Sequence, residues 1–136
     1  MRSDSSARSD RIAAMQQLFA LRGAISVEHN DAQDILDATT ELMQAIMSRN
    51  SLQPESVVSC IFTATNDLNA EFPAVAARAI GFQNVPLLCA REIPVPRSMP
   101  RVIRVLIHYH ADEDHEPVHV YLGDARALRE DLHAAQ

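Results

Sequence analysis

The sequence predicts an α+β fold, in which a mixed sheet of about five strands carries two main helices on one side. Three observations lead to this fold class: a length of 136 residues, a β-α-β-α-β-β-β order of strand-like and helix-like segments, and the absence of any internal repeat. A chain of this length forms one domain, which we place at residues 18–136. Residues 1–17 are expected to be a disordered leader, because residues 1–11 are serine-rich, polar and without periodicity.

The first half of the chain predicts a strand, a helix and a second strand. Apolar residues alternate loosely over residues 19–27, which is typical of a strand. Asn30 or Asp31 can then cap a helix. Residues 57–65 are rich in β-branched and apolar residues, so they predict a largely buried strand. The apolar residues of the helix between the two strands recur at helical spacing and share one face: Ile35, Leu36, Leu42, Met43, Ile46 and Met47.

Proline and glycine mark the second helix. The pair Phe72 and Pro73 begins it and Gly81 ends it, because proline suits the first turn of a helix and glycine suits its C-terminal cap. A loop with three prolines separates the next two strands. The remaining strands of the sheet are expected over residues 87–92, 102–110 and 118–122.

Composition and charge exclude several classes of protein. The chain is 47% hydrophobic and 22% charged, which is typical of a globular domain. Its longest apolar runs are far shorter than the ~20 residues that span a bilayer, and its N-terminus lacks an apolar signal segment, so we expect no membrane partner. A net charge of −6 disfavours nucleic acid as a partner. Two cysteines do not make a disulfide framework, so a cytoplasmic location is expected.

The placement of the arginines points to a small anionic ligand. Residues 86–110 contain four arginines against a single acid, Glu92. Arg104 interrupts the apolar run over residues 102–107, where an unpaired guanidinium is costly to bury, and Arg22 poses the same question in the first strand. Two strand-borne arginines could clamp a carboxylate with bidentate hydrogen bonds. An internal salt bridge or a solvated sheet face would explain them equally well.

Three other polar side chains have a structural and a functional interpretation. Glu92 could act as a general base, accept a hydrogen bond from a ligand hydroxyl, or pair with Arg91 or Arg104. Tyr121 fits a half-buried strand aromatic better than a catalytic hydroxyl. Cys89 fits a small buried apolar residue better than a nucleophile. Pairing is the commoner outcome for Glu92, so the residues alone predict only an arginine-lined anion site.

Four histidines near the C-terminus raise the possibility of a metal. They are interleaved with three acids, and residues two apart on a strand share a face. The acids fit a solvated turn between two strands better, and no second cluster of ligands accompanies them, so we expect no metal. No Ser-His-Asp or Cys-His arrangement is recognisable either. The histidines concerned are His108, His110, His115 and His119.

Several short segments together resemble the monofunctional, trimeric chorismate mutases, the α/β type typified by bacilli. Each segment alone is weak, but their order and separation are shared over about residues 19–132. The resemblance implies a homotrimer whose sheets pack into a pseudo-α/β-barrel, with one active site at each subunit interface. The matching segments are LRGA (residues 21–24), TATNDL (63–68), FPA (72–74), AR (77–78), VP (85–86), CARE (89–92), IRV (103–105) and HVYL (119–122).

The resemblance also implies a reaction and a role for each site residue. The reaction is the Claisen rearrangement of chorismate to prephenate, which needs no proton transfer, covalent intermediate, metal or cofactor. Arg104 would bind the ether oxygen, Arg22 and Tyr121 a substrate carboxylate, and Glu92 the ring hydroxyl. The same subunit would also supply Cys89 to the hydroxyl and Leu128 and Arg129 to the site, while the neighbour would supply Phe72 against the ring and Arg78 at the entrance.

Two departures and three alternatives accompany this resemblance. Val75 stands where a lysine is expected and Leu88 where a threonine often precedes the cysteine, so we expect altered substrate affinity more than lost chemistry. The first alternative is a non-catalytic trimeric module that binds a small carboxylate, against which the presence of both Arg104 and Glu92 argues. The second is a trimeric imine deaminase, whose motifs do not match this segment order, and the third is a histidine-based metalloenzyme.

Overall fold

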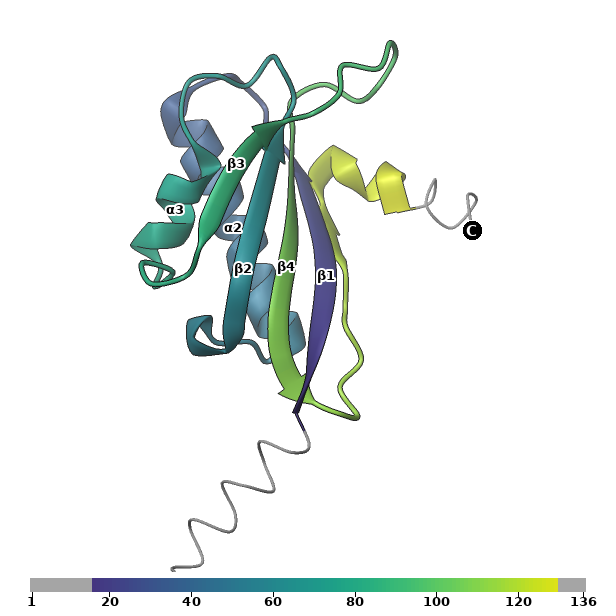
Figure 1. Cartoon of the computed structure of the whole chain (residues 1–136). Coiled ribbons are helices and arrows are strands. Elements are labelled where there is room, and N and C mark those ends of the chain that lie inside the picture. The colour runs from purple at the N-terminus through teal and green to yellow at the C-terminus, as the bar shows by residue number, and fades with distance from the viewer. Residues whose placement is uncertain (1–15, 130–136) are drawn as a thin grey trace, which may run out of the picture.

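The computed structural model of the chain describes residues 16–129. Every strand and helix expected from the sequence is present within that range (Figure 1). Two short 3₁₀ turns, Pro54–Ser56 and Gly123–Ala125, accompany them, and residues 126–129 are helical. The strands and main helices are β1 (Gln16–Ser26), α2 (Ala32–Asn50), β2 (Val57–Ala64), α3 (Pro73–Ala79), β3 (Leu87–Arg91), β4 (Val102–Asp112) and β5 (Val120–Leu122).

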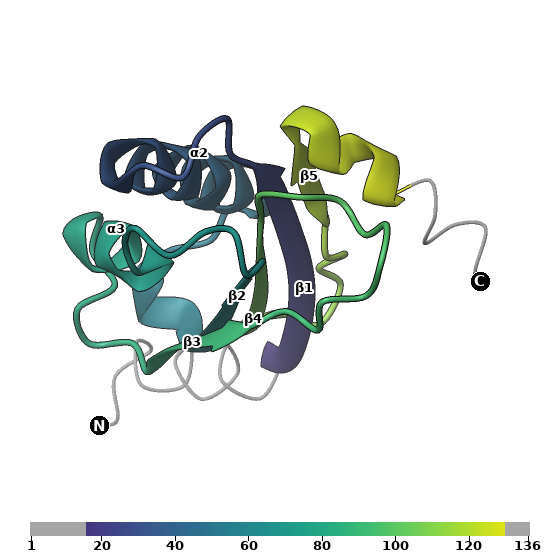
Figure 2. The ribbon, with the colours of Figure 1, turned by 90° about the horizontal axis from the view of Figure 1, so that it is seen from above.

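The described strands form one mixed sheet in the order β3-β2-β4-β1-β5. The long central strand β4 runs antiparallel to both of its neighbours, β1 and β2, whereas β5 is parallel to β1 and β3 is parallel to β2. Both α2 and α3 lie on the same side of this sheet (Figure 2). The predicted α+β class, with two main helices on one side of a mixed sheet, is therefore confirmed.

The core fills the space between the sheet and the two helices. Because side chains alternate along a strand, Leu21, Ile25 and Val105 point to the helices and are buried there. The predicted apolar face of α2 supplies the opposite wall of the same cluster. Asp31 caps α2 as expected, since its side chain accepts a hydrogen bond from the Asp34 N–H at 3.1 Å.

Strand ends differ from the sequence expectation where long-range partners decide them. Strand β1 begins at Gln16, so it includes two residues, 16 and 17, that we assigned to the leader. These residues pair with the end of β4, which therefore continues to Asp112. Strand β5 begins only at Val120, because the Asn50 side chain takes both backbone groups of Val118, at 2.8 and 3.0 Å. The rest of the predicted leader, residues 1–15, lies outside the described residues, as do residues 130–136.

Gly23 lies where β1 passes closest to α2, and we expect that Gly23→Ala destabilises the fold. A Cβ atom at this position would lie 2.7 Å from Ile46 Cδ1 and 3.2 Å from both Leu42 Cδ1 and Val105 Cγ1. Overpacking of this kind costs about 1 to 3 kcal/mol. Urea unfolding at one fixed protein concentration measures the effect, with the exposed Ala20→Ser on the same strand as the control. An unchanged unfolding midpoint for Gly23→Ala would contradict this packing.

The sheet face that points away from α2 and α3 carries the polar residues. Leu106 and Ile61 are only half-buried there, and Arg22 is exposed. Figure 2 shows that the segment joining β3 to β4 and the helical residues 126–129 lie on this side. Within the described chain, Met99 and Leu128 pack against a small cluster formed by Ala24, Val102, Tyr121 and Ala125. We call the sheet face that points away from α2 and α3 the open face.

Candidate active site

Four side chains line up in one row across the open face. Strand register places Thr63 of β2 opposite Arg104 of β4, Arg104 opposite Ala24 of β1, and Ala24 opposite Tyr121 of β5. Residues that are directly opposite in a sheet point to the same face. Because Ala24 has a single methyl group, it leaves room between the guanidinium of Arg104 and the ring of Tyr121. Arg22 lies two residues from Ala24 on β1 and so shares this face.

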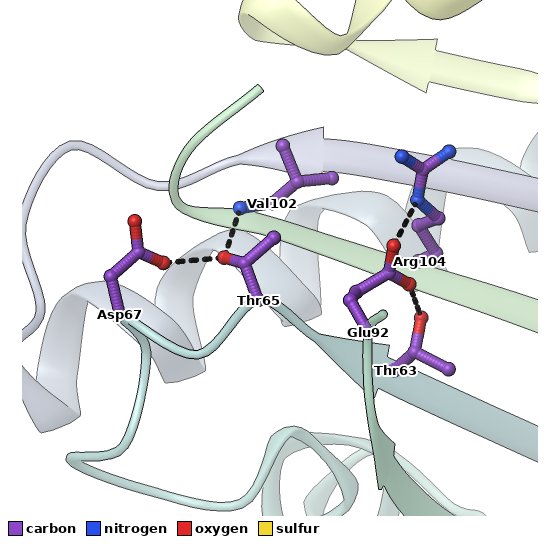
Figure 3. Close-up of polar contacts among 6 residues, drawn as sticks. All are labelled: Thr63, Thr65, Asp67, Glu92, Val102 and Arg104. Atoms are coloured by element: carbon purple, nitrogen blue, oxygen red, sulfur yellow. Dashed lines mark hydrogen bonds and ion pairs between the residues drawn. The ribbon is translucent and has the colours of Figure 1, made fainter. Parts of the chain in front are cut away.

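Arg104 and Glu92 form an ion pair beside this row. The Arg104 Nε lies 2.9 Å from Glu92 Oε1, and the Thr63 hydroxyl donates a hydrogen bond to the other oxygen, Oε2 (Figure 3). The Glu92 side chain is 18% exposed and that of Arg104 38%. Glu92 lies one residue past the end of β3, and its backbone N–H donates a hydrogen bond to the Ala64 carbonyl at 3.0 Å, which holds it in place. The structure thus selects Arg104 over Arg91 as the partner of Glu92.

The ion pair leaves the outer half of the Arg104 guanidinium free. Its two Nη nitrogens point away from Glu92 (Figure 3), and among residues 16–129 they have no hydrogen-bond partner. They border a cavity of about 340 Å³ that is open on one side. Two arginines and one carboxylate around such a cavity suit a small ligand with several negative groups. The polar and aromatic residues lining it are Arg22, Thr63, Glu92, Arg104 and Tyr121.

A second polar network fixes the start of β4, two residues before Arg104. The Thr65 hydroxyl accepts the Val102 N–H at 3.1 Å and donates to the Asp67 carboxylate (Figure 3). That carboxylate also accepts the Arg101 N–H at 3.0 Å. Arg101 has a positive φ of 49°, so this network holds a turn that few non-glycine residues adopt. The chain therefore enters β4 in one register, which sets the position of Arg104.

Phe72 and Cys89 lie in a different place from the ion pair. They line a separate cavity of about 310 Å³ between α3 and the β3 edge of the sheet. We grouped Cys89 with Arg104 in one subunit's share of the site, but alternation along β3 turns Cys89, like Leu87, toward the helix side. Phe72 is 64% exposed, so the chain itself does not bury it. One copy of the chain therefore brings together only part of the predicted set.

The remaining predicted site residues lie at the margins. Arg78 is exposed in the last turn of α3, and Arg129 is exposed at the end of the described chain. Leu128 packs on the cluster that contains Tyr121, so it belongs to the Arg104 side. Val75 is half-buried in α3 and Leu88 is 61% exposed on β3. Neither departure from the expected pattern touches the ion pair.

The histidines serve different partners instead of a common centre. His115 Nε2 lies 2.7 Å from the Tyr109 hydroxyl, and His119 Nδ1 accepts the Arg22 N–H at 3.0 Å. His108 Nδ1 lies 3.3 Å from the Ser59 hydroxyl. Across residues 16–129, no three His, Cys, Asp or Glu side chains converge as metal ligands would. The same part of the chain contains no helix long and apolar enough to cross a membrane.

Two contacts around the open-face cavity do not follow from the sequence. Thr63 was an ordinary strand residue by sequence, since threonine favours strands, and only the register of β2 against β4 places it beside Arg104. His119 was counted as a possible metal ligand, whereas its ring accepts a backbone N–H of β1. No local signal in the sequence distinguishes either role.

Comparisons with known proteins agree on one family. The family model described as chorismate mutase type I matches residues 18–132. A chorismate mutase of Thermus thermophilus is 50% identical over 118 residues, which is 85% of this chain and 97% of that protein. A chorismate mutase of Bacillus subtilis is 39% identical over 114 residues, 82% of this chain and 90% of that protein. A solved chorismate mutase structure from Clostridium thermocellum aligns with a TM-score of 0.74 and 38% identity, covering 80% of this chain and 98% of its own.

Proposed function

Because the chain belongs to the type I chorismate mutase family, we propose that Arg104, Glu92 and Arg22 carry out the rearrangement of chorismate to prephenate in the open-face cavity. The enzyme is a chorismate mutase, an isomerase of aromatic amino acid biosynthesis. The observation that supports the residue roles is the Arg104–Glu92 pair, which fixes the guanidinium at Nε and leaves both Nη donors at the cavity.

The chemistry of the reaction defines what these residues must do. One ether C–O bond breaks and one C–C bond forms within a single molecule, so no atom, proton or electron leaves the substrate. The enzyme cannot gain by bringing two reactants together, but it can hold the compact conformer in which the reacting carbons are close. It can also bind the charge distribution of the transition state more tightly than that of chorismate.

Arg104 meets the negative charge that develops during bond breakage. As the C–O bond lengthens ahead of C–C bond formation, negative charge grows on the ether oxygen and positive character on the ring. The two Nη donors of Arg104 bind that oxygen and an adjacent carboxylate, and they need no reorganisation because Glu92 already holds Nε. The Glu92 carboxylate binds the ring hydroxyl and faces the ring as it becomes positive. Arg22 and Tyr121 bind a carboxylate of the substrate.

A complete site requires a second copy of the chain, and we propose that the enzyme is a homotrimer with an active site at each subunit interface. Phe72 and Cys89 line a cavity of their own, separate from that of Arg104, so a neighbour's Phe72 and Cys89 would close the open side. Phe72 then packs on the ring and Arg78 joins Arg129 at the entrance. Exposed apolar residues near the β3 edge, Leu88 and Ile93, support burial by a neighbour.

Mixed trimers test this division of the site. Arg104→Ala removes one half, and Phe72→Asp puts a negative charge against the dianionic substrate in the other, so each variant alone is expected to be nearly inactive. Co-refolding equal amounts of the two variants should restore about a quarter of the wild-type activity. In randomly mixed trimers, about a quarter of the subunit interfaces combine an intact Arg104 with an intact Phe72. Native mass spectrometry confirms that mixed trimers have formed. Mixed trimers without activity would mean that both residues serve the same subunit's site.

The state of the cysteines supports a cytoplasmic location. Cys60 and Cys89 are both free thiols in the structure. Burial raises the pKa of the Cys60 thiol to about 12, so it stays protonated and unreactive. Free thiols in an enzyme of this size are typical of reducing compartments. We therefore place the reaction in the cytoplasm.

A further inference from the structure

A histidine side chain continues the pairing of β1 just before β5 begins. The parallel pairing of β1 with β5 extends over three positions, from Gly23 opposite Val120 to Ile25 opposite Leu122. One residue earlier on each strand, the pairing is no longer backbone to backbone. The Arg22 N–H donates instead to Nδ1 of the His119 ring, at 3.0 Å. The imidazole thus takes the place of a strand carbonyl.

This contact lies between two residues that share the open-face cavity. The ring binds the backbone N–H of Arg22, whose side chain lines the cavity. Tyr121 of β5, which also lines the cavity, comes two residues after His119. Losing the contact leaves the Gly23–Val120 pairing in place but removes the bond that precedes it, so the Arg22 backbone and the start of β5 are held less firmly. The aim of the Arg22 guanidinium and the distance between Arg22 and Tyr121 therefore both depend on the His119 ring.

The ring can accept the Arg22 N–H only when Nδ1 carries no proton. A neutral imidazole has one acceptor nitrogen, whereas an imidazolium has two donors and none. Burial lowers the pKa of His119 first, and the positive charges of Arg22 on β1 and Arg129 in the helical segment after β5 lower it further. Neutral pH therefore keeps the acceptor, and acidification through this lowered pKa, below the ordinary value of 6.5, removes it.

We propose that His119 is a positioning residue for substrate binding, whose neutral ring fixes Arg22 and Tyr121 and whose protonation releases them. The inference rests on the proposed function, because it assumes that these two residues bind a carboxylate of chorismate. It predicts that protonation of a residue that does not touch the substrate lowers kcat/KM at acid pH. The fold is expected to persist on protonation, since the β1–β4 pairing is independent of His119.

Two substitutions distinguish the effect of losing the hydrogen-bond acceptor from the effect of protonating the ring. In His119→Asn, the side-chain oxygen replaces Nδ1 as an acceptor but does not titrate, so kcat/KM should stay near the wild-type value at pH 8 and lose its acid limb. In His119→Phe the acceptor is gone, so kcat/KM at pH 8 should fall roughly 5- to 30-fold, mainly through KM, and should show no acid limb. His29→Asn, at an exposed histidine that does not line the cavity, is the matched control and should keep the wild-type profile.

The Arg22 amide gives a readout that does not depend on turnover. In ¹H–¹⁵N spectra of the wild-type protein, its resonance should shift with an inflection below pH 6.5, and in His119→Asn it should not. An acid limb that survives in His119→Asn, or an Arg22 amide that does not respond to pH, would overturn the proposal. Wild-type protein that turns over no chorismate at pH 8 would instead contradict the proposed residue roles, and the amide titration would still test the His119 contact.

Discussion

Replacing Arg104 with alanine is expected to lower kcat on chorismate by roughly 10²- to 10³-fold, or about 3 to 4 kcal/mol in the barrier. The reason is that both Nη donors are free of protein partners among residues 16–129 and already held in place by Glu92. Preorganised donors of this kind bind the developing charge without reorganising during the reaction. Steady-state kinetics, following the loss of chorismate and the gain of prephenate, measure the effect.

The loss must be separated from misfolding and from a general loss of positive charge. Arg49→Ala removes one positive charge from an exposed position in the last turn of α2, and it should leave kcat and KM unchanged. The Arg104 variant should unfold at a urea concentration close to that of the wild type, because the Arg104 side chain is 38% exposed. A folded Arg104→Ala with wild-type kcat would mean that other residues stabilise the transition state.

Glu92→Gln is expected to lower kcat roughly 10- to 100-fold, because a hydrogen bond to a charged group contributes about 1.5 to 3 kcal/mol. The amide keeps the shape of the side chain, but it removes the charge that holds Arg104 Nε and faces the ring. Glu92→Asp keeps the charge and shortens the reach, so its kcat should lie between those of the wild type and Glu92→Gln. Kinetics of the three proteins at one pH decide the order.

A double variant tests whether Glu92 acts through Arg104. If the carboxylate mainly fixes the guanidinium, its loss matters less once Arg104 is absent, so Arg104→Ala with Glu92→Gln should lose less activity than the product of the two single losses. Fully multiplicative losses would contradict the coupling. Equal kcat values for wild type and Glu92→Gln would remove Glu92 from the charge argument altogether.

Local patterns in the sequence predicted the elements well, and long-range contacts set what they missed. The helix α2 follows from its apolar face and the Asp31 cap, which are both properties of neighbouring residues. The late start of β5 at Val120 depends on the Asn50 side chain, which is distant in sequence. The sheet order also depends on long-range pairing, so the sequence predicted a mixed sheet but not the central place of β4.

The same contrast applies to the site. Arg104 was recognisable because a charge in an apolar strand calls for an anionic partner, and its partner Glu92 is 12 residues away in the sequence. The sequence left that pairing open among three alternatives. The hydroxyl of Thr63 joins the pair only through strand register, and Cys89 points to the helix side because of its position along β3. Such facts depend on geometry that no short segment encodes.

The central claim is that the fixed positive charge of Arg104 stabilises the transition state, and its most direct test is kcat at saturating chorismate for Arg104→Gln and Arg104→Lys. Glutamine keeps a hydrogen-bond donor without charge, whereas lysine keeps a charge that cannot hold Glu92 and the substrate at once. We predict a loss of roughly 10²-fold or more for Arg104→Gln and a smaller loss for Arg104→Lys. A kcat for Arg104→Gln within about threefold of the wild type, less than ~0.7 kcal/mol, would contradict the account.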